Sequence, residues 1–198
     1  FQIFENEFVN DSRFVKVVAT QASNSWVTNY IMERFSETQY NPTAVTADAI
    51  GVAPYYGGVA DDFVNANTYT TCSVSDILDS MEYSMPESFN WMDDNQIVAD
   101  SFNVDLIAYE GGQHLVDWQN RDITKAPTKH YIAANRDWRM AKAYKDFLDE
   151  WKRAGGELFI NFSAPRTYQW FGSWGTREYL TQSDRSAPKH RAILSFIK

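Results

Sequence analysis

The residues best suited to chemistry lie at the end of a predicted strand. Residues 104–109 are mostly apolar and β-compatible, which predicts a strand that is covered on both faces. Glu110 follows, and Gly111 and Gly112 then break the pattern, so the backbone can turn sharply or approach a ligand closely. Parallel α/β barrels hold their catalytic groups at the carboxyl ends of strands. We therefore expect Glu110 to be catalytic, with a solvated loop charge as the ordinary alternative.

Four segments of this kind alternate with helical segments along the chain. Strands are predicted at 13–20, 48–54, 104–109 and 157–162, and helices at 1–8, 27–35, 72–81, 86–102, 135–154 and 187–198. This alternation indicates an α/β protein with a parallel sheet and right-handed crossovers. Residues 1–198 are expected to form a single domain. Four β/α units make either an open, doubly wound sheet or strands five to eight of a TIM (β/α)8 barrel whose N-terminal half is absent from the chain.

Polar and aromatic loops follow the carboxyl ends of the predicted strands. They cover residues 21–26, 55–58, 110–115 and 163–174. Because the carboxyl ends of parallel strands meet at one edge of a sheet, we expect the four loops to build a single site. Aromatic residues make up 16 % of the chain, and rings in such loops can serve as platforms for the apolar faces of sugars. Each single ring is equally compatible with a place in the core.

The composition argues against several classes of function. A net charge of −8 and a pI of about 4.8 argue against nucleic-acid binding and against an anionic membrane surface. Cys72 is the single cysteine, so no intrachain disulfide and no cysteine-based metal site is expected, and the three histidines lack the spacing of a zinc site. No cofactor is implied. The sequence contains no apolar run of about 18 residues, so no membrane span is expected.

Other local signals concern processing and surface charge. The N-terminal residues carry acids where a signal peptide would be basic, and the chain lacks an initiator Met, so we expect it to be cut or processed from a longer one. Glycosylation sequons occur at Asn10-Asp-Ser12 and Asn161-Phe-Ser163, and the second is discounted because it falls at a predicted strand end. Asp61-Asp62 and Asp93-Asp94 are expected to be solvated charges, with calcium binding as the alternative.

Five stretches of the chain resemble one group of proteins. They are Ala-Thr-Gln-Ala-Ser-Asn-Ser-Trp (19–26), Ala-Ile-Gly-Val-Ala-Pro-Tyr-Tyr-Gly (49–57), Ala-Tyr-Glu-Gly-Gly-Gln-His-Leu (108–115), Ala-Asn-Arg-Asp-Trp-Arg-Met (134–140) and Gly-Ser-Trp-Gly (172–175). In this order they resemble bacterial secreted proteins labelled cellulose-binding or glycoside-hydrolase-like, over nearly the whole chain. The chain looks like the C-terminal half of a clan-A retaining glycoside hydrolase barrel, from the helix after strand four to the C-terminus.

The resemblance implies an activity and a role for Glu110. In that clan two Glu residues perform hydrolysis and the nucleophile ends strand seven, a role that carries onto Glu110. The acid/base follows an Asn at the end of strand four and is expected upstream of Phe1, since Asn6-Glu7 lies in a helical pattern without a preceding strand. The implied function is hydrolysis of a β-linked polysaccharide by a secreted or cell-surface protein, completed by the missing half of the barrel or by another chain.

The other candidate residues are expected around this nucleophile. Tyr55 or Tyr56 would donate a hydrogen bond that keeps the Glu110 carboxylate ionised. We expect sugar hydroxyls to be bound by Gln21, Asn24, Gln113 and His114. We expect sugar rings to stack on Trp26, Trp170 and Trp174, and Trp174 to form the floor beneath the sugar at the cleavage point. Two alternatives stay open. One is a non-catalytic carbohydrate-binding protein that uses the same surface, and the other is a structural or assembly protein in which the half-barrel pairs with another chain.

Overall fold

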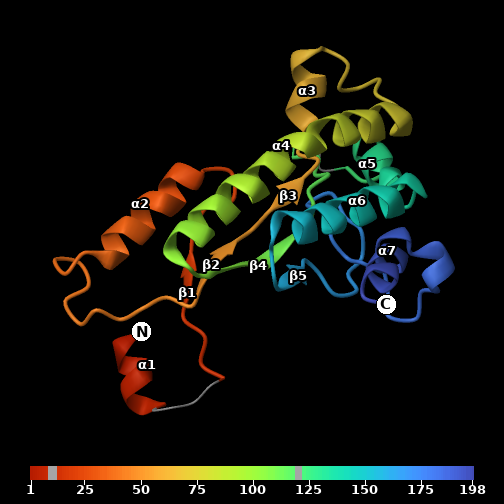
Figure 1. Cartoon of the computed structure of the whole chain (residues 1–198). Coiled ribbons are helices and arrows are strands. Elements are labelled where there is room, and N and C mark those ends of the chain that lie inside the picture. Colours follow the sequence, from red (N-terminus) through yellow and green to blue (C-terminus); the bar gives the residue numbers. More distant parts are fainter. Residues whose placement is uncertain (9–12, 119–121) are drawn as a thin grey trace. The chain divides into compact units, whose positions relative to one another are not determined.

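The computed structural model describes residues 1–8, 13–118 and 122–198 (Figure 1). Its elements are, in order, α1 (Gln2–Glu7), β1 (Val17–Ala19), α2 (Ser25–Ser36), β2 (Ala49–Val52), β3 (Tyr55–Tyr56), α3 (Ala60–Asn65), α4 (Val74–Phe102), β4 (Asp105–Gln113), α5 (Thr128–Ala134), α6 (Arg139–Ala154), β5 (Phe159–Asn161), the 3-10 helix η1 (Asp184–Ser186) and α7 (Pro188–Phe196). The five strands form one parallel sheet, so the predicted α/β class is confirmed. The sequon at residues 10–12 lies outside the described residues.

The chain divides into two compact units, each assembled from three segments. Unit 1 comprises residues 1–54, 90–110 and 152–160, and unit 2 comprises residues 55–89, 111–151 and 161–198. The division passes through β4 between Glu110 and Gly111, and through α4 between Phe89 and Asn90. Each unit has its own set of buried side chains.

Unit 1 is built on parallel strands that follow chain order. β1 pairs with β2 and β2 pairs with β4, which places Val18, Ile50 and Leu106 side by side. β5 pairs with β4 as well, and the Glu157 amide preceding it donates a hydrogen bond to the Leu106 carbonyl over 2.9 Å. The strand order β1-β2-β4-β5 contains no reversal. A sheet without a reversal is singly wound, because a doubly wound sheet changes direction at a switch point.

Helices α2 and α4 cover the same face of the unit 1 sheet. The Thr28 hydroxyl of α2 donates a hydrogen bond to Asn95 Oδ1 of α4 over 2.7 Å. The Asn95 amide donates in turn to the Ala22 carbonyl over 2.8 Å. Two helices in contact cannot lie on opposite faces of a sheet. Ile50 and Leu106, each 0 % exposed, supply the apolar side chains of the covered face.

The opposite face of the unit 1 sheet exposes apolar side chains. Gly51 lies there between Val17 and Tyr109, whose side chains come within 2.8 and 3.4 Å of the position that a Cβ on Gly51 would occupy. Tyr109 is nevertheless 43 % exposed, and Ala19, in register with Gly51, is exposed too. Apolar side chains gathered on one face gain free energy when a further layer removes them from water. Within unit 1, the described helices supply such a layer on one side of the sheet.

Helix α4 runs without a break from Val74 to Phe102 (Figure 1). The prediction of two helices, the second beginning at Pro86, is therefore wrong. Buried side chains along α4 recur at alternating spacings of three and four residues: Leu78, Met81, Met85, Ser88, Met92, Asn95 and Ala99. A proline inside a helix costs roughly 3 kcal/mol, because it removes a hydrogen bond and crowds the preceding turn. The continuous buried stripe offsets that cost.

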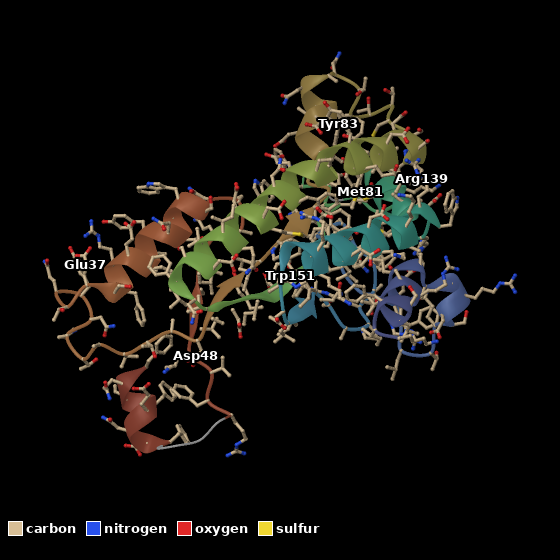
Figure 2. The ribbon with its side chains drawn as sticks, viewed as in Figure 1. Glu37, Asp48, Met81, Tyr83, Arg139 and Trp151 are labelled. Carbon is tan, nitrogen blue, oxygen red and sulfur yellow. The ribbon has the colours of Figure 1, made fainter. Side chains whose placement is uncertain are left out.

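Aromatic side chains form the core of unit 2. The Tyr56 ring of β3 lies 4.6 Å from Phe147 and 5.9 Å from Tyr144 of α6, measured between ring centroids. Figure 2 labels two further core residues, Met81 of α4 and Trp151 of α6, which are 0 % and 2 % exposed. Such rings contribute large apolar areas and fix one another in edge-on or tilted contacts. Unit 2 is thus held by packed rings.

Strand β4 is longer than the sequence predicts. It continues to Gln113, so Glu110 lies inside the strand and not at its end. Gly112 still pairs with Tyr55 of β3. Between the pair Val52–Ala108 and the pair Tyr55–Gly112, β4 has three residues where the partner segment has two. This extra residue is a bulge, which re-aims side chains and interrupts the alternation of faces around Glu110. β3 lies within the predicted loop 55–58, and α3 and α5 lie in stretches where no helix was predicted.

Candidate functional site

Rings from three predicted loops meet in unit 2. The His114 ring centroid lies 5.4 Å from that of Tyr55 and 5.9 Å from that of Trp174. Phe162, which follows β5, packs edge-on against Trp174 with the centroids 5.6 Å apart. Tyr55 comes from β3, His114 directly follows β4, and Trp174 comes from the loop after β5. We call these four residues the ring cluster.

Trp174 is held in place by its neighbours. A Cβ on Gly172 would come within 2.3 Å of the indole ring, and Gly172 has a φ of +142°, so only glycine fits beneath the ring. The Arg166 guanidinium lies 5.9 Å from the ring centroid, within the range of a cation–π contact. The indole N–H is buried without a hydrogen-bond partner among the described residues.

Asn161, at the end of β5, is a second unpartnered polar group. Both its amide nitrogen and its amide oxygen are buried and lack a partner among the described residues. Its oxygen lies 3.3 Å from the position that a Cβ on Gly112 would occupy. Buried polar atoms are nearly always hydrogen-bonded in native proteins, so unpartnered ones beside the ring cluster point to a polar ligand or to water. The burial also agrees with setting aside the sequon at Asn161.

A pocket of about 210 Å³ opens beside His114. It is lined by Gly58, Ala60, Asp61, His114, Val116 and Trp118. Trp118 is 55 % exposed, and its ring offers an apolar wall next to the Asp61 carboxylate. Pockets for drug-sized ligands measure about 300–1,000 Å³, so this one suits a smaller group, such as one sugar ring.

The surroundings of His114 favour the neutral form of its imidazole. Burial lowers the pKa of its imidazole below the ordinary value of 6.5, because desolvation disfavours the charged form. The neutral ring has one N–H donor and one nitrogen acceptor. That pair can serve two neighbouring hydroxyl groups of a neutral ligand.

Gln113 takes a role other than the predicted sugar contact. Its side chain is 0 % exposed. Its amide nitrogen donates to the Ser173 carbonyl over 2.9 Å, and its amide oxygen accepts the Leu115 N–H over 2.8 Å. With both ends engaged and no exposed surface, Gln113 connects β4 to the loop that carries Trp174 and is removed from direct contact with a ligand in solution.

Tyr56 also differs from its predicted role. Its ring is 2 % exposed, and its hydroxyl lies 3.9 Å from the Met140 sulfur. Burial raises the pKa of Tyr56 well above the ordinary value. The residue packs the core of unit 2, so Tyr55 remains the tyrosine of the predicted pair that reaches the ring cluster.

Trp170 lies in the same loop as Trp174, after β5. Its ring is half-buried and packs edge-on against Phe171, with the centroids 5.4 Å apart. The Arg166 guanidinium lies over Phe171 at 5.1 Å as well as over Trp174. Trp170 therefore supports the outer part of this loop.

Glu110 belongs to unit 1 and is half-buried. Its carboxylate makes no hydrogen bond or ion pair with the described residues of unit 1. A carboxylate that attacks a sugar needs donors that keep it ionised. Unit 1 does not supply the donors that the sequence predicts around Glu110.

The other predicted residues of unit 1 sit around the start of α2. Asn24 is the N-cap, and its side chain accepts the Val27 N–H over 3.3 Å. Trp26 is 68 % exposed and stacks on Tyr30, with the centroids 5.4 Å apart. Gln21 is exposed in the preceding turn. A capping role thus accounts for Asn24, while Trp26 and Gln21 stay accessible.

Sequence reasoning missed several residues of this region. Trp118 follows the polar stretch after β4, and its place in an aromatic loop was an available signal. Asp61 was interpreted as a solvated charge, yet it lines the pocket. Asn161 carries no signal in the sequence, since its unpartnered amide is a property of the packing. A larger cavity of about 450 Å³, lined by Ile123, Thr124, Lys129, Ile132, Ala133, Arg136 and Tyr168, contains no predicted site residue.

Comparison with known proteins does not identify a family. The chain matches no protein-family model, no curated protein and no solved structure. Within residues 1–8, 13–118 and 122–198, no group of three or more His, Cys, Asp or Glu side chains is arranged to hold a metal ion. The same residues form no helix long and apolar enough to cross a membrane. The function is therefore argued from the geometry of the site.

Proposed function

We propose that the chain recognises a β-linked polysaccharide and forms half of a retaining glycoside hydrolase barrel of a secreted or cell-surface protein. The ring cluster carries the proposal. Tyr55, His114 and Trp174 offer flat apolar faces next to a neutral donor and acceptor, and the pocket beside His114 adds the Trp118 ring. Sugars need this combination, because they present apolar C–H faces together with hydroxyl edges.

The half-barrel part of the proposal rests on the sheet of unit 1. Its strands follow chain order, α2 and α4 lie on one face, and the other face exposes Tyr109 and Ala19. In a closed barrel, helices cover the outer face and side chains from all strands fill the interior. We assign the strands to positions five to eight, and the remaining strands to the missing half or to another chain.

The catalytic part assigns Glu110 as the nucleophile. In retaining hydrolysis its carboxylate oxygen bonds to the anomeric carbon while the glycosidic C–O bond breaks, and a second carboxyl group protonates the departing oxygen. Water, deprotonated by that second group, then releases the sugar from Glu110. The second group is assigned to the polypeptide that completes the barrel.

A non-catalytic carbohydrate-binding function is the second candidate. It is favoured by the Glu110 carboxylate, which lacks a hydrogen-bond donor within unit 1. The two candidates agree on the ring cluster and differ only in the chemistry of Glu110.

The experiment for Glu110 uses the full protein that contains this sequence. Hydrolysis of β-glucan, xylan and mannan is measured for the parent and for Glu110→Gln, alongside binding of the same polymers. A nucleophile predicts loss of hydrolysis by a factor of 10³ or more, on the order of 4 kcal/mol or more in the barrier, with binding retained. Unchanged hydrolysis would remove the catalytic assignment, and binding without hydrolysis in the parent would select the second candidate.

A further inference from the structure

Lys189 is a buried lysine that the proposed chemistry does not use. It lies in the first turn of α7 and is 0 % exposed. Its amine donates hydrogen bonds to the Ser173 carbonyl and to Asn135 Oδ1, the latter over 3.0 Å. The nitrogen also lies 4.3 Å from the centroid of the Tyr168 ring. Burying a lysine is costly, so its hydrogen bonds have to hold the amine in a defined place.

The Ser173 carbonyl receives two buried donors. The amine of Lys189 comes from α7, and the Gln113 amide comes from the end of β4 at 2.9 Å. This carbonyl belongs to the peptide that joins Ser173 to Trp174. Because a peptide unit is planar, fixing its carbonyl also fixes the direction in which the Trp174 backbone continues. Gly172 beneath the indole completes the restraint on the ring.

The chemistry of the amine suits this role. Burial lowers the pKa of Lys189 well below its ordinary value, and the nearby Glu178 carboxylate opposes the shift. The amine donates to two oxygen acceptors, Ser173 O and Asn135 Oδ1, so its position is defined from two directions. Asn135 is itself 0 % exposed and anchored through its amide to the Tyr131 carbonyl at 3.0 Å.

We propose that Lys189 is a positioning residue for the ring cluster. By holding the peptide between Ser173 and Trp174, it sets the orientation of the indole against His114 and thereby the affinity of the site for a sugar. The statement about affinity rests on the proposed function. The statement about the orientation of Trp174 does not.

A double-mutant cycle tests the coupling between Lys189 and Trp174. Affinity for β-1,4-linked gluco-, xylo- and mannohexaose is measured for the parent, Lys189→Met, Trp174→Ala and the double variant. In the parent, Lys189→Met is expected to weaken binding of the hexasaccharide with the highest affinity by about tenfold. In the Trp174→Ala background it is expected to have no further effect on affinity, because the effects of coupled sites are not additive. Equal effects in both backgrounds, or no effect in the parent, would overturn the proposal. Lys142→Met, at an exposed lysine of α6, is the matched control.

Near-ultraviolet circular dichroism separates this inference from the proposed function. The Trp174 signal is the parent spectrum minus that of Trp174→Ala, and it is compared with the same difference in the Lys189→Met background. The two difference spectra are expected to have different shapes or intensities, because Lys189→Met changes the orientation of the Trp174 ring. Identical difference spectra would contradict the positioning role of Lys189. If no hexasaccharide binds, the proposed function fails and the spectra alone decide on Lys189. If Lys189→Met does not fold, Lys189→Gln, which is too short to span both acceptors, replaces it with the same expectations.

Discussion

The two units bury different kinds of side chain. The buried apolar residues of unit 1, such as Ile50 and Leu106, are aliphatic, while rings of that unit such as Tyr109 are exposed. Unit 2 buries its rings, among them Tyr144 and Trp151. Packed rings fix one another and the loops that rest on them, so unit 2 can hold a preorganised surface. Unit 1 instead leaves apolar side chains such as Tyr109 exposed on one face of its sheet.

Both units bury hydrogen-bonded polar side chains, as Thr28 and Asn95 show in unit 1, but the two candidate sites differ in their polar groups. Unit 2 contains buried polar side chains that engage each other, Gln113 and Lys189 through the Ser173 carbonyl, next to atoms without partners at Asn161 and Trp174. In unit 1, Glu110 is half-buried without a donor from that unit. The contrast fits the proposal that unit 2 recognises the ligand, while chemistry at Glu110 would need groups from outside unit 1.

The largest expected effect comes from removing a ring from the core of unit 2. Phe147→Ala is expected to lower the free energy of unfolding by about 3–5 kcal/mol, because a fully buried ring leaves a cavity. Urea denaturation followed by circular dichroism measures the change. A loss below about 1 kcal/mol would mean that the rings of unit 2 are not its structural core.

The pH dependence of the free energy of unfolding tests the buried amine of Lys189 in unit 2. Because the pKa of Lys189 is lowered in the folded chain, the unfolded chain binds more protons between that lowered value and about 10.4. The free energy of unfolding of the parent therefore rises with pH in this window, relative to Lys189→Met, by at most about 1.4 kcal/mol per pH unit. Urea denaturation of both proteins from about pH 7 to about pH 10 measures the difference. Parallel curves would show that Lys189 keeps its ordinary pKa.

A substitution on the exposed face of unit 1 is expected to be mild. Tyr109→Ser should change the free energy of unfolding of this chain by about 1 kcal/mol or less, because the residue is 43 % exposed. The half-barrel proposal predicts a larger loss where a second half of a barrel covers the ring. A loss above about 2 kcal/mol in the isolated chain would show that the face is already covered.

The smallest expected effect concerns the exposed ring at the start of α2. Trp26→Ala should leave hexasaccharide affinity unchanged within about twofold, because the Trp26 ring is already stacked on Tyr30. Isothermal titration gives the affinity, with Trp174→Ala as the positive control. A tenfold loss would return Trp26 to the binding site that the sequence predicts.

Regular periodicity made part of the fold predictable. Each of the four predicted strand segments contains a strand, because apolar runs bounded by Gly and polar residues mark them. Ser73 and Asp76 mark the start of α4 through reciprocal hydrogen bonds. Pro86 led to the wrong prediction of a helix start, because proline usually interrupts a helix. The row of buried side chains that keeps α4 continuous is visible only in the tertiary structure. Gly111 and Gly112 led to the prediction that the strand ends before them, but β4 continues through both and pairs with β3 at Gly112.

Site residues were predictable by place but not by role. The loops after the strands drew attention to Tyr55, His114 and Trp174, which do meet in unit 2. Nothing in the sequence distinguishes an exposed amide at Gln113 from one that is 0 % exposed with both ends bonded. Lys189 had no pattern at all, because its importance arises from contacts with segments distant in the chain.

The central claim is that the ring cluster binds a sugar, and a titration followed by nuclear magnetic resonance tests it most directly. The indole N–H signals of the isotope-labelled chain are followed as the β-linked hexasaccharides are added. We expect the signals of Trp174 and Trp118 to shift in a saturable way, while those of Trp26 and of Trp138, which is 69 % exposed outside the ring cluster and its pocket, stay in place. Unmoved signals of Trp174 and Trp118 at millimolar sugar would contradict the account.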